Sequence, residues 1–436
     1  MPDLKSTARH IFSETLAAID IPATLQRKLA RSGTRIHCAS ATVDLAAFRQ
    51  IRVVAFGKAA FAMATGLSDI LAPDFRPLGI LVTPSTAPCV LDGFQMFVAG
   101  HPVPTAQSLA AGRAILDLLT SCDEHTLVFF LLSGGGSALV ELPLDPLLTL
   151  DDVQSFNRLL VTCGAPVDEI NAVRKHLSAV KGGRLAATAP LSTKLTFGVS
   201  DVPVGRESAL ASGPTLPDPT TIADALRVIQ RYNLLNKLPP RLRTLLERPA
   251  LVETPKPGDP AFARAYFEIL LDVHDLFHQA HRVAEAAGCV TICDNSTDDW
   301  PLDKAADFLL DQLAQLRQAN PGRRVAVIAD GEVSSPVTGN GTGGRNSAFV
   351  LYCVEKIADK QVAVLSAGTD GVDGNSPAAG AVSDGASFRR ARAAGLDPDD
   401  FFRRSDAYNF FKQLDDALET GPTGNNLRDL RILLAE

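Results

Sequence analysis

Short hydrophobic runs alternate with longer amphipathic stretches along the first half of this 436-residue chain. The runs fall at residues 51–56, 78–83, 94–99, 127–132 and 194–200. Several of them are apolar at consecutive positions, which is typical of strands buried on both faces of a parallel sheet. Residues 4–19 carry their apolar positions at helical spacing instead. This half therefore predicts an α/β domain built on a mostly parallel sheet, with an amphipathic helix at the start.

A proline-rich segment interrupts this alternation, and a second alternation follows it. Helical patterns near 274–288, 303–318 and 346–358 are separated by apolar runs at 289–293, 325–330 and 362–368. We expect two α/β domains, residues 1–235 and 271–436, joined by an inter-domain passage over 236–270. Ligand sites in such pairs favour the cleft between the domains, so the active site is expected there.

Composition and charge narrow the class of protein. A net charge of −7 and a pI near 5.7 argue against a general binder of nucleic acid or membrane surfaces. Seven cysteines, an odd number without a CxxC pair, indicate reduced thiols. The first residues lack the apolar core of a signal peptide, and no apolar run has the length of a membrane span. These features predict a cytoplasmic protein.

A glycine-rich loop follows the apolar run at 127–132. An apolar strand that ends in glycines before a helix is the usual geometry for holding an anion on backbone N–H groups. A tight strand-to-helix turn is the alternative, and the segment alone does not decide between them. The loop residues are Ser133, Gly134, Gly135, Gly136 and Ser137.

Two cationic residues lie at predicted helix starts. Lys58 follows the run at 51–56, where a side chain projects into the ligand crevice of an open α/β sheet, although the Walker A pattern is absent. Arg345 follows glycines 339, 341, 343 and 344 and could clamp a transferring phosphoryl group. The same glycines form a G-x-G-x-x-G, but no hydrophobic strand directly precedes it, so it is a weak dinucleotide fingerprint.

Basic and acidic clusters supply further candidates, each with a simpler alternative. Residues 170–186 pack four cations around Gly182 and Gly183, which suits phosphate groups but also a solvated helix face. Asp201 follows the run at 194–200 and could bind magnesium, act as a base, or cap a turn. Asp370 lies in a glycine-rich acidic loop that suits metal-bound phosphates or a series of Asx turns.

Three histidines, His274, His278 and His281, share one helical face. Three imidazoles can bind zinc, but no carboxylate or cysteine completes a recognisable metal spacing, so partly buried or surface imidazoles are the favoured interpretation.

Taken together, the motifs resemble one known family. In chain order they are "FGKA", "GHPVP", "LSGGGSAL", "EINAVRKHLSAVKGGRLA", "SDVP", "ASGPT", "GTGGRNSAF", "AGTDGVDG" and "TGPTGNNL". The set is similar to the glycerate 2-kinase family, whose C-terminal half is the MOFRL domain. The resemblance implies an N-terminal Rossmann-like domain, a C-terminal α/β domain, and phosphorylation of D-glycerate at its 2-hydroxyl with ATP and Mg²⁺ in the cleft.

The resemblance also implies roles for single residues. Lys58 and Arg345 match the catalytic lysine and arginine. Because each follows a predicted strand and is flanked by small or hydroxyl residues, Asp201 and Asp370 are the magnesium candidates, and Asp201 is also a catalytic candidate. Substrate contacts are expected from His101, Asn171, Arg174 and Arg206. Nucleotide contacts are expected from the loop 133–137 and from Lys181, Gly182, Gly183, Gly341, Gly343 and Gly344. Partners would be a small hydroxy acid and a nucleotide, and a homodimer is left open.

The chain departs from the family pattern at Thr105, at Arg206 and Glu207, and at Pro377. Two of these changes remove acids from predicted site loops, which leaves the metal arrangement and the acceptor open between D-glycerate and a longer sugar acid. Arg206 could grip a carboxylate, or it could point to solvent and pair with Glu207. Two other functions stay in view: an NAD(P)H-dependent hydroxypyruvate reductase, a label that family members also carry, and a non-catalytic sugar-acid binding protein.

Overall fold

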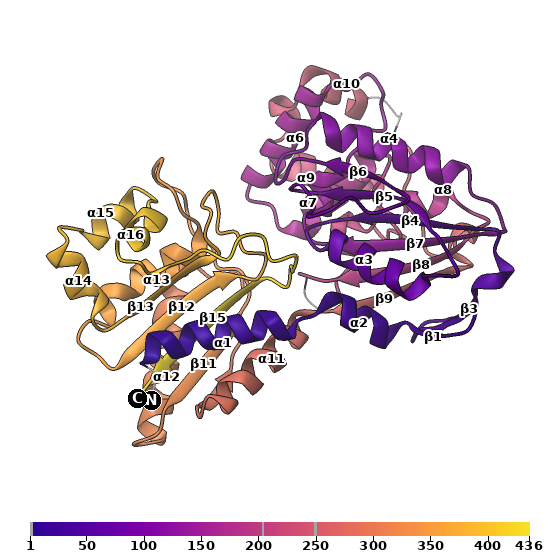
Figure 1. Ribbon diagram of the computed structural model, residues 1–436. Coiled ribbons are helices and arrows are strands. Elements are labelled where there is room, and N and C mark those ends of the chain that lie inside the picture. The colour runs from indigo at the N-terminus through magenta and orange to yellow at the C-terminus, as the bar shows by residue number, and fades with distance from the viewer. Residues whose placement is uncertain (1–2, 203–204, 248–250) are drawn as a thin grey trace. The chain divides into compact units, whose positions relative to one another are not determined.

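The computed structural model describes residues 3–202, 205–247 and 251–436 (Figure 1). The chain forms two compact units. One unit comprises residues 21–272, and the other combines residues 1–20 with residues 273–436. No helix in the described residues is both long enough and apolar enough to cross a membrane.

The unit of residues 21–272 is built on a six-stranded sheet whose neighbouring strands are all parallel. Its strand order is β6-β5-β4-β7-β8-β9. The strands are β4 (Gln50–Phe56), β5 (Leu78–Thr83), β6 (Phe94–Val98), β7 (Thr126–Ser133), β8 (Thr193–Val199) and β9 (Ala265–Leu271). Every residue of β7 and β8 is buried, which explains their consecutive apolar positions. The Rossmann-like parallel sheet predicted from the sequence is confirmed.

The strand order reverses between β4 and β7. From β4 the chain proceeds outward through β5 and β6, then returns to the other side of β4 with β7 and continues to β8 and β9. In open parallel sheets, ligands bind outside the carboxyl ends of the strands at this reversal, the topological switch point. The loops after β4 and β7 are therefore the first place to look for a site.

Helices surround this sheet, and those nearest to it pack on its two faces (Figure 1). The helices of this unit are α2 (Ile21–Lys28), α3 (Ala60–Leu71), α4 (Ala106–Thr120), α5 (Gly136–Leu139), α6 (Leu150–Thr162), α7 (Val167–Leu177), α8 (Arg184–Thr188), α9 (Ile222–Arg231) and α10 (Pro240–Glu247). Apolar side chains of α4 pack with Val54 and Val128 in one core, and α6, α7, α9 and α10 share a second core around Leu160 and Val173. A small antiparallel sheet is formed by β1 (Ala30–Ser32), β2 (Arg35–His37) and β3 (Thr42–Asp44).

The second unit holds a mixed sheet in the order β10-β11-β15-β12-β13-β14. Its strands are β10 (Val290–Cys293), β11 (Val325–Asp330), β12 (Val362–Gly368), β13 (Gly380–Asp384), β14 (Ala417–Leu418) and β15 (Asp429–Ala435). Within this sheet only the β10–β11 pair is parallel among the described strands, and the last strand, β15, lies between β11 and β12 and is antiparallel to both. This insertion brings the start of β15 beside the ends of β11 and β12.

The helices of this unit are α1 (Leu4–Ala18), α11 (Val273–Ala286), α12 (Leu302–Ala319), α13 (Arg345–Lys356), α14 (Ser387–Ala393), α15 (Pro398–Arg403) and α16 (Ala407–Gln413). Leu309 of α12, Phe349 of α13 and Phe410 of α16 are fully buried in one core with alternate residues of β11. Helix α1 packs against β12, β15 and α11. The C-terminal α/β domain expected from the sequence is thus present.

The compact units differ from the predicted boundaries in two places. Helix α1 packs with the second unit, where its buried Ile11 and Phe12 face the sheet and Lys5 Nζ lies 2.9 Å from Asp416 Oδ1. Residues 236–270 do more than link two domains, because they form α10 and most of the edge strand β9. Hydrophobic periodicity reports that a helix has a buried face, but not which sheet that face covers.

Candidate functional site

Two loops are locked together at the switch point of the parallel sheet. After β4, the backbone N–H of Lys58 donates to Gly134 O at 3.0 Å, and the N–H of Ala59 donates to Ser133 Oγ at 2.9 Å. Gly57 has a φ of +128°, and a methyl group there would lie 2.1 Å from Ser133 Oγ. The loop after β4 and the glycine-rich loop after β7 therefore form one rigid surface.

Lys58 and His101 both lie against Gly135. A methyl group on Gly135 would lie 3.0 Å from His101 Cδ2 and 3.5 Å from Lys58 Cγ, and its φ of +82° also favours glycine. Lys58 is half-buried, whereas His101, in the loop after β6, is exposed. The structure thus brings together Lys58, His101 and the glycine loop, three of the groups that the sequence predicts. The glycine run allows these side chains to approach the backbone closely.

A chain of buried or half-buried polar groups leads away from the glycine loop. Ser137 Oγ lies 2.7 Å from Ser212 Oγ at the end of the 3₁₀ segment Glu207–Ser212, and Ser212 donates to Asn171 Oδ1 at 3.0 Å. Asn171 belongs to α7, so this chain connects α7 to the carboxyl edge of the sheet.

The structure argues against a phosphate-binding role for Lys181, Gly182 and Gly183. Lys181 is 1% exposed and its Nζ lies 2.6 Å from Glu141 Oε2. Burial lowers the pKa of Lys181, and the Glu141 carboxylate opposes that effect. The N–H groups of Gly182 and Gly183 donate to the carbonyls of Ser212 and Gly213 at 3.1 and 2.7 Å. The Lys181 side chain and the N–H groups of Gly182 and Gly183 therefore all bond within the protein itself.

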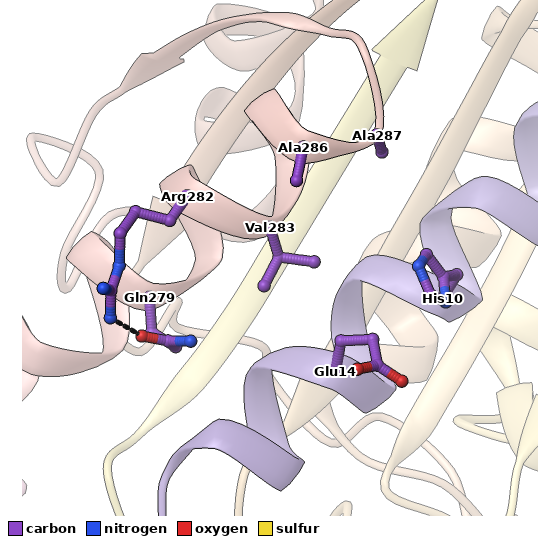
Figure 2. Close-up of a pocket in the computed structure, with 7 residues that line it drawn as sticks. All are labelled: His10, Glu14, Gln279, Arg282, Val283, Ala286 and Ala287. Atoms are coloured by element: carbon purple, nitrogen blue, oxygen red, sulfur yellow. Dashed lines mark hydrogen bonds between the residues drawn. The ribbon is translucent and has the colours of Figure 1, made fainter.

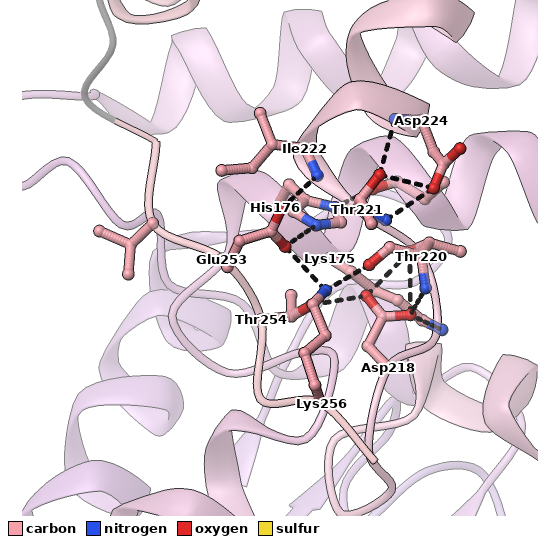
Figure 3. A network of polar contacts seen from close by, with 12 residues as sticks. Lys175, His176, Asp218, Thr220, Thr221, Ile222, Asp224, Glu253, Thr254 and Lys256 are labelled. Carbon is pink, nitrogen blue, oxygen red and sulfur yellow. Dashed lines mark hydrogen bonds and ion pairs between the residues drawn. The ribbon is translucent and has the colours of Figure 1, made fainter. Parts of the chain in front are cut away.

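Other residues of the same segment also have internal partners. Lys175 Nζ lies 3.3 Å from Asp218 Oδ1, and His176 Nε2 lies 3.3 Å from Glu253 Oε2 (Figure 3). Both pairs tie α7 to the segments around residues 218 and 253. Arg174 differs, since its guanidinium has no hydrogen-bond or ion-pair partner within 3–202, 205–247 and 251–436.

The residues after β8 separate into an inner and an outer group. Asp201 is half-buried and lies two residues beyond β8, at the same sheet edge as the glycine loop. Arg206 is exposed and pairs with Asp168 at 3.2 Å. Glu207 instead accepts the N–H of Gly205 at 2.8 Å, so Arg206 is exposed, as one of the two alternatives has it, but its partner is Asp168 rather than Glu207.

In the second unit, Arg345 is the first residue of α13 and is held by two carboxylates. Its Nε lies 2.5 Å from Asp429 Oδ2 and its Nη2 lies 2.8 Å from Glu332 Oε1. Burial alone would lower the pKa of Arg345, but Asp429 and Glu332 outweigh it and raise that pKa. Asp429 is itself buried, and the Arg345 cation keeps the pKa of Asp429 below its usual value. Arg345 is therefore a fixed, permanently charged group.

The glycine loop before α13 is used to build the fold. The N–H of Gly341 donates to Arg404 O at 3.0 Å, that of Gly343 to Asn375 Oδ1 at 2.8 Å, and that of Gly344 to Ser347 Oγ at 3.2 Å. These contacts argue against the predicted nucleotide contacts of Gly341, Gly343 and Gly344. Strand β11 ends at Asp330, well before the G-x-G-x-x-G, so the strand–loop–helix context of a dinucleotide site is also missing there.

The N-terminus of α13 is capped by an acid. Asp373 accepts the N–H groups of Asn346 and Ser347 at 2.9 and 2.8 Å and the Ser347 hydroxyl at 2.6 Å. Burial raises the pKa of Asp373 to about 6, although these three donors act in the opposite direction. The cap fixes the start of the helix that carries Arg345.

Asp370 lies near the same arginine. A methyl group on Gly368 would lie 3.0 Å from Asp370 Oδ1 and 3.4 Å from Asp429 Oδ1, so the two carboxylates face a common point at the end of β12. In the described residues, no group of three or more His, Cys, Asp or Glu side chains is arranged to hold a metal ion. Mg²⁺ usually takes only one or two protein carboxylates and completes its shell with phosphate and water oxygens. The oxygen donors here fit that pattern.

Sequence reasoning missed Glu332 and Asp429. Glu332 follows "DG" at the end of the run 325–330, and Asp429 follows the "TGPTGNNL" motif. An acidic residue just after a predicted strand is a pattern that could have indicated Glu332 as a site residue. Asp429 precedes its strand, and only the antiparallel insertion of β15 places it beside Arg345.

A groove of about 320 Å³ lies elsewhere in the second unit, between α1 and α11 (Figure 2). It is lined by His10, Glu14, Gln279, Arg282, Val283, Ala286 and Ala287. None of the site residues considered above lines it.

The parallel sheet carries a lysine and a glycine loop at its switch point, and the second unit carries an arginine held by two carboxylates. These features define a two-unit α/β protein. The chain belongs to the family with DUF4147 and MOFRL regions. Residues 7–247 match the family described as "Domain of unknown function (DUF4147)", and residues 325–429 match the MOFRL family.

Named relatives share most of the chain. It is 35% identical to a D-glycerate 2-kinase of Thermotoga maritima, over 88% of this chain and 90% of that protein. It is 36% identical to an Agrobacterium vitis protein whose name refers to hydroxypyruvate reductase, over 88% of this chain and 98% of that protein. The crystal structure of a Thermotoga maritima glycerate kinase matches with a TM-score of 0.81 and 32% identity, covering 99% of both chains. The resemblance to glycerate 2-kinases with a MOFRL domain is confirmed.

Proposed function

We propose that this protein is a kinase that transfers a phosphoryl group from ATP to the 2-hydroxyl of D-glycerate or a related short 2-hydroxy acid. The observation that carries the proposal is the position of Lys58 at the switch point, against Gly135 and beside His101. The kinase names of the relatives support the same reaction class.

Phosphoryl transfer requires positioning and neutralisation of charge more than covalent chemistry. Lys58 supplies a positive charge at the carboxyl edge of the parallel sheet, and Arg345 supplies a planar fork that Asp429 and Glu332 hold in one orientation. We assign both cations to the transferred phosphoryl group. Asp201, at the same edge as Lys58, is the candidate for accepting the proton of the attacking hydroxyl.

Magnesium would be held by Asp370 and Asp201 and would neutralise phosphate charge during transfer. The surroundings of Arg345 support this requirement. Asp370 and Asp429 present carboxylate oxygens close to Arg345, so a bound Mg²⁺ would offset the repulsion between these carboxylates and a phosphate.

The test is a turnover assay with purified protein, ATP, Mg²⁺ and D-glycerate, with ADP release as the signal and ³¹P NMR to separate 2-phosphoglycerate from 3-phosphoglycerate. We expect 2-phosphoglycerate. NADH oxidation with hydroxypyruvate and no ADP release would establish the reductase instead. Binding of hydroxy acids without either turnover would establish a non-catalytic binding protein.

Variants at the two cations sharpen the assignment. Lys58→Met should reduce kcat on the order of a thousandfold, because one cationic clamp on the phosphoryl group is lost. For Arg345 the informative change is Arg345→Lys, which keeps a charge beside buried Asp429 but removes the fork. Turnover near the wild-type rate in either variant would remove that residue from the mechanism.

A further inference from the structure

Arg174 is a partly buried cation whose donors have no partner. It lies in the last turn of α7, and its Nε is fully shielded from solvent without a hydrogen bond in the described parts of the chain. Burial lowers the pKa of this guanidinium, and the nearby Glu141 carboxylate partly opposes that effect. A shielded, unpaired cation is costly unless something else supplies the acceptor. The unused donors of Arg174 therefore point to an anionic ligand.

The neighbouring cations show that this is a local exception. Lys175 pairs with Asp218, and Lys181 pairs with Glu141. Arg184 donates to Val252 O at 2.7 Å. The basic cluster is therefore not one phosphate-binding patch, because its other members serve the fold. Among the described residues, Arg174 is the one arginine of this cluster whose guanidinium donors are all unused.

The position of Arg174 connects it to the candidate site. Asn171 and Arg174 are three residues apart on α7 and so share one face of the helix. Asn171 accepts from Ser212, which contacts Ser137 in the segment that follows Gly135. The same face of α7 is thus linked through three side chains to the loop that touches Lys58 and His101.

The local charge selects the kind of anion. Arg174 and Lys181 carry two positive charges, and Glu141 carries one negative charge that is already paired with Lys181 at 2.6 Å. A net charge of about +1 suits a monoanion better than a polyphosphate. A guanidinium also matches a carboxylate through two parallel N–H···O bonds.

We propose that Arg174 binds the carboxylate of the hydroxy-acid acceptor, and that this contact selects acids over neutral alcohols. The inference rests on the proposed kinase function and names the substrate group that one residue recognises. The nucleotide has no share in this contact, which separates Arg174 from Lys58 and Arg345.

The test measures KM for D-glycerate and KM for ATP in wild type, Arg174→Met and Arg174→Lys, with Arg184→Met as the matched control from the same cluster. We expect Arg174→Met to raise KM for D-glycerate on the order of a hundredfold while KM for ATP stays within about twofold, because charge-assisted bonds to a carboxylate are lost. KM for D-glycerate in Arg174→Lys should lie between the values of wild type and Arg174→Met, since lysine keeps the positive charge but lacks the two parallel N–H donors of arginine. Arg184→Met should resemble wild type.

The outcomes separate this inference from the proposed function. A wild-type protein that phosphorylates neither D-glycerate nor four- and five-carbon aldonic acids removes the kinase proposal. If the wild type is active and Arg174→Met has the wild-type KM for D-glycerate, only the carboxylate site is removed. The same holds if KM for D-glycerate and KM for ATP rise equally in that variant. If Arg174→Met does not fold, the same comparison in Arg174→Lys decides, because that variant keeps the positive charge and most of the side-chain volume.

Discussion

Lys181 offers the sharpest test between a structural and a functional interpretation of one residue. The sequence predicts a nucleotide contact, whereas the structure buries Lys181 against Glu141, which is 7% exposed and also accepts from Ser178 at 2.6 Å. Lys181→Met removes the cation and leaves the Glu141 carboxylate buried without its counter-charge. Breaking a buried pair from one side costs about 3–5 kcal/mol. The remaining bonds from Ser178 and the Leu142 N–H favour the lower end, about 3 kcal/mol.

Calorimetry converts this cost into a measurable shift. For a unit of this size, each kcal/mol lowers Tm by about 2–4 °C, so we expect a fall of roughly 10 °C in the transition of the unit that contains Lys181. Adding Glu141→Gln should restore most of the stability, because an uncharged pair needs no counter-charge. KM for ATP in the surviving protein should stay near the wild-type value. A Tm equal to wild type, combined with a tenfold rise in KM for ATP, would refute the structural interpretation and restore the predicted phosphate contact.

Three further predictions concern other sites. Gly135→Ala should abolish most turnover, since its methyl group would press on His101. Gly164→Ala is the control, because φ is +80° there and +82° at Gly135, so both variants carry a backbone strain of about 1–2 kcal/mol, but Gly164 has no neighbour within 4 Å and should keep its activity. Equal kcat values in the two variants would contradict this. Asp429→Asn should lower kcat about a hundredfold with little change in KM for ATP, because Arg345 loses the negative charge that holds its Nε. Asp416→Asn removes another buried carboxylate of that unit and should affect Tm only. Burial raises the pKa of Asp330 to about 6 from 3.8, so the folded state binds this proton more tightly than the unfolded state. The free energy of unfolding should therefore fall by on the order of 3 kcal/mol as pH rises between about 4 and 6. Asp330→Asn should remove that slope in urea titrations, and an unchanged slope would assign it to other groups.

The parts of the fold that could be predicted are those that local pattern determines. Runs of consecutive apolar residues became β7 and β8 because both faces of a parallel sheet are covered, and the position of Lys58 after such a run placed it at the ligand edge. The two-unit organisation followed from two separate alternations. The assignment of α1 did not, because its partner strands lie more than 300 residues away in the chain.

The parts that could not be predicted depend on pairings between distant residues. Lys181 meets a carboxylate 40 positions away, and Arg345 meets one 84 positions away. Before these partners are known, a buried lysine and a phosphate-binding lysine look the same in a sequence. The sequence groups the four cations of 170–186 for that reason, although in the structure two pair with buried carboxylates, Arg184 donates to a carbonyl, and Arg174 has no partner in the described residues.

Glycines show the same limit. A methyl group on Gly135 would meet the side chains of His101 and Lys58, whereas one on Gly341 or Gly183 would meet a backbone carbonyl and a packed side chain. All three glycines lie in loops that precede a helix, so spacing does not distinguish them. What distinguishes them is the group that a side chain would meet: candidate site residues in the first case, and atoms of the packed fold in the other two.

The departures from the family pattern can now be placed against the candidate site. Thr105 precedes α4, and its Oγ1 accepts the N–H of Gly100 at 3.1 Å, so it closes the turn that carries His101. Arg206 is exposed and pairs with Asp168, and Pro377 is exposed in the turn that follows Asp373. None of the three pairs with Arg345 or Arg174 in the described residues. The cations that we propose for the phosphoryl group and for the acceptor carboxylate are therefore all retained, and Thr105 is the departure that contacts the turn carrying His101.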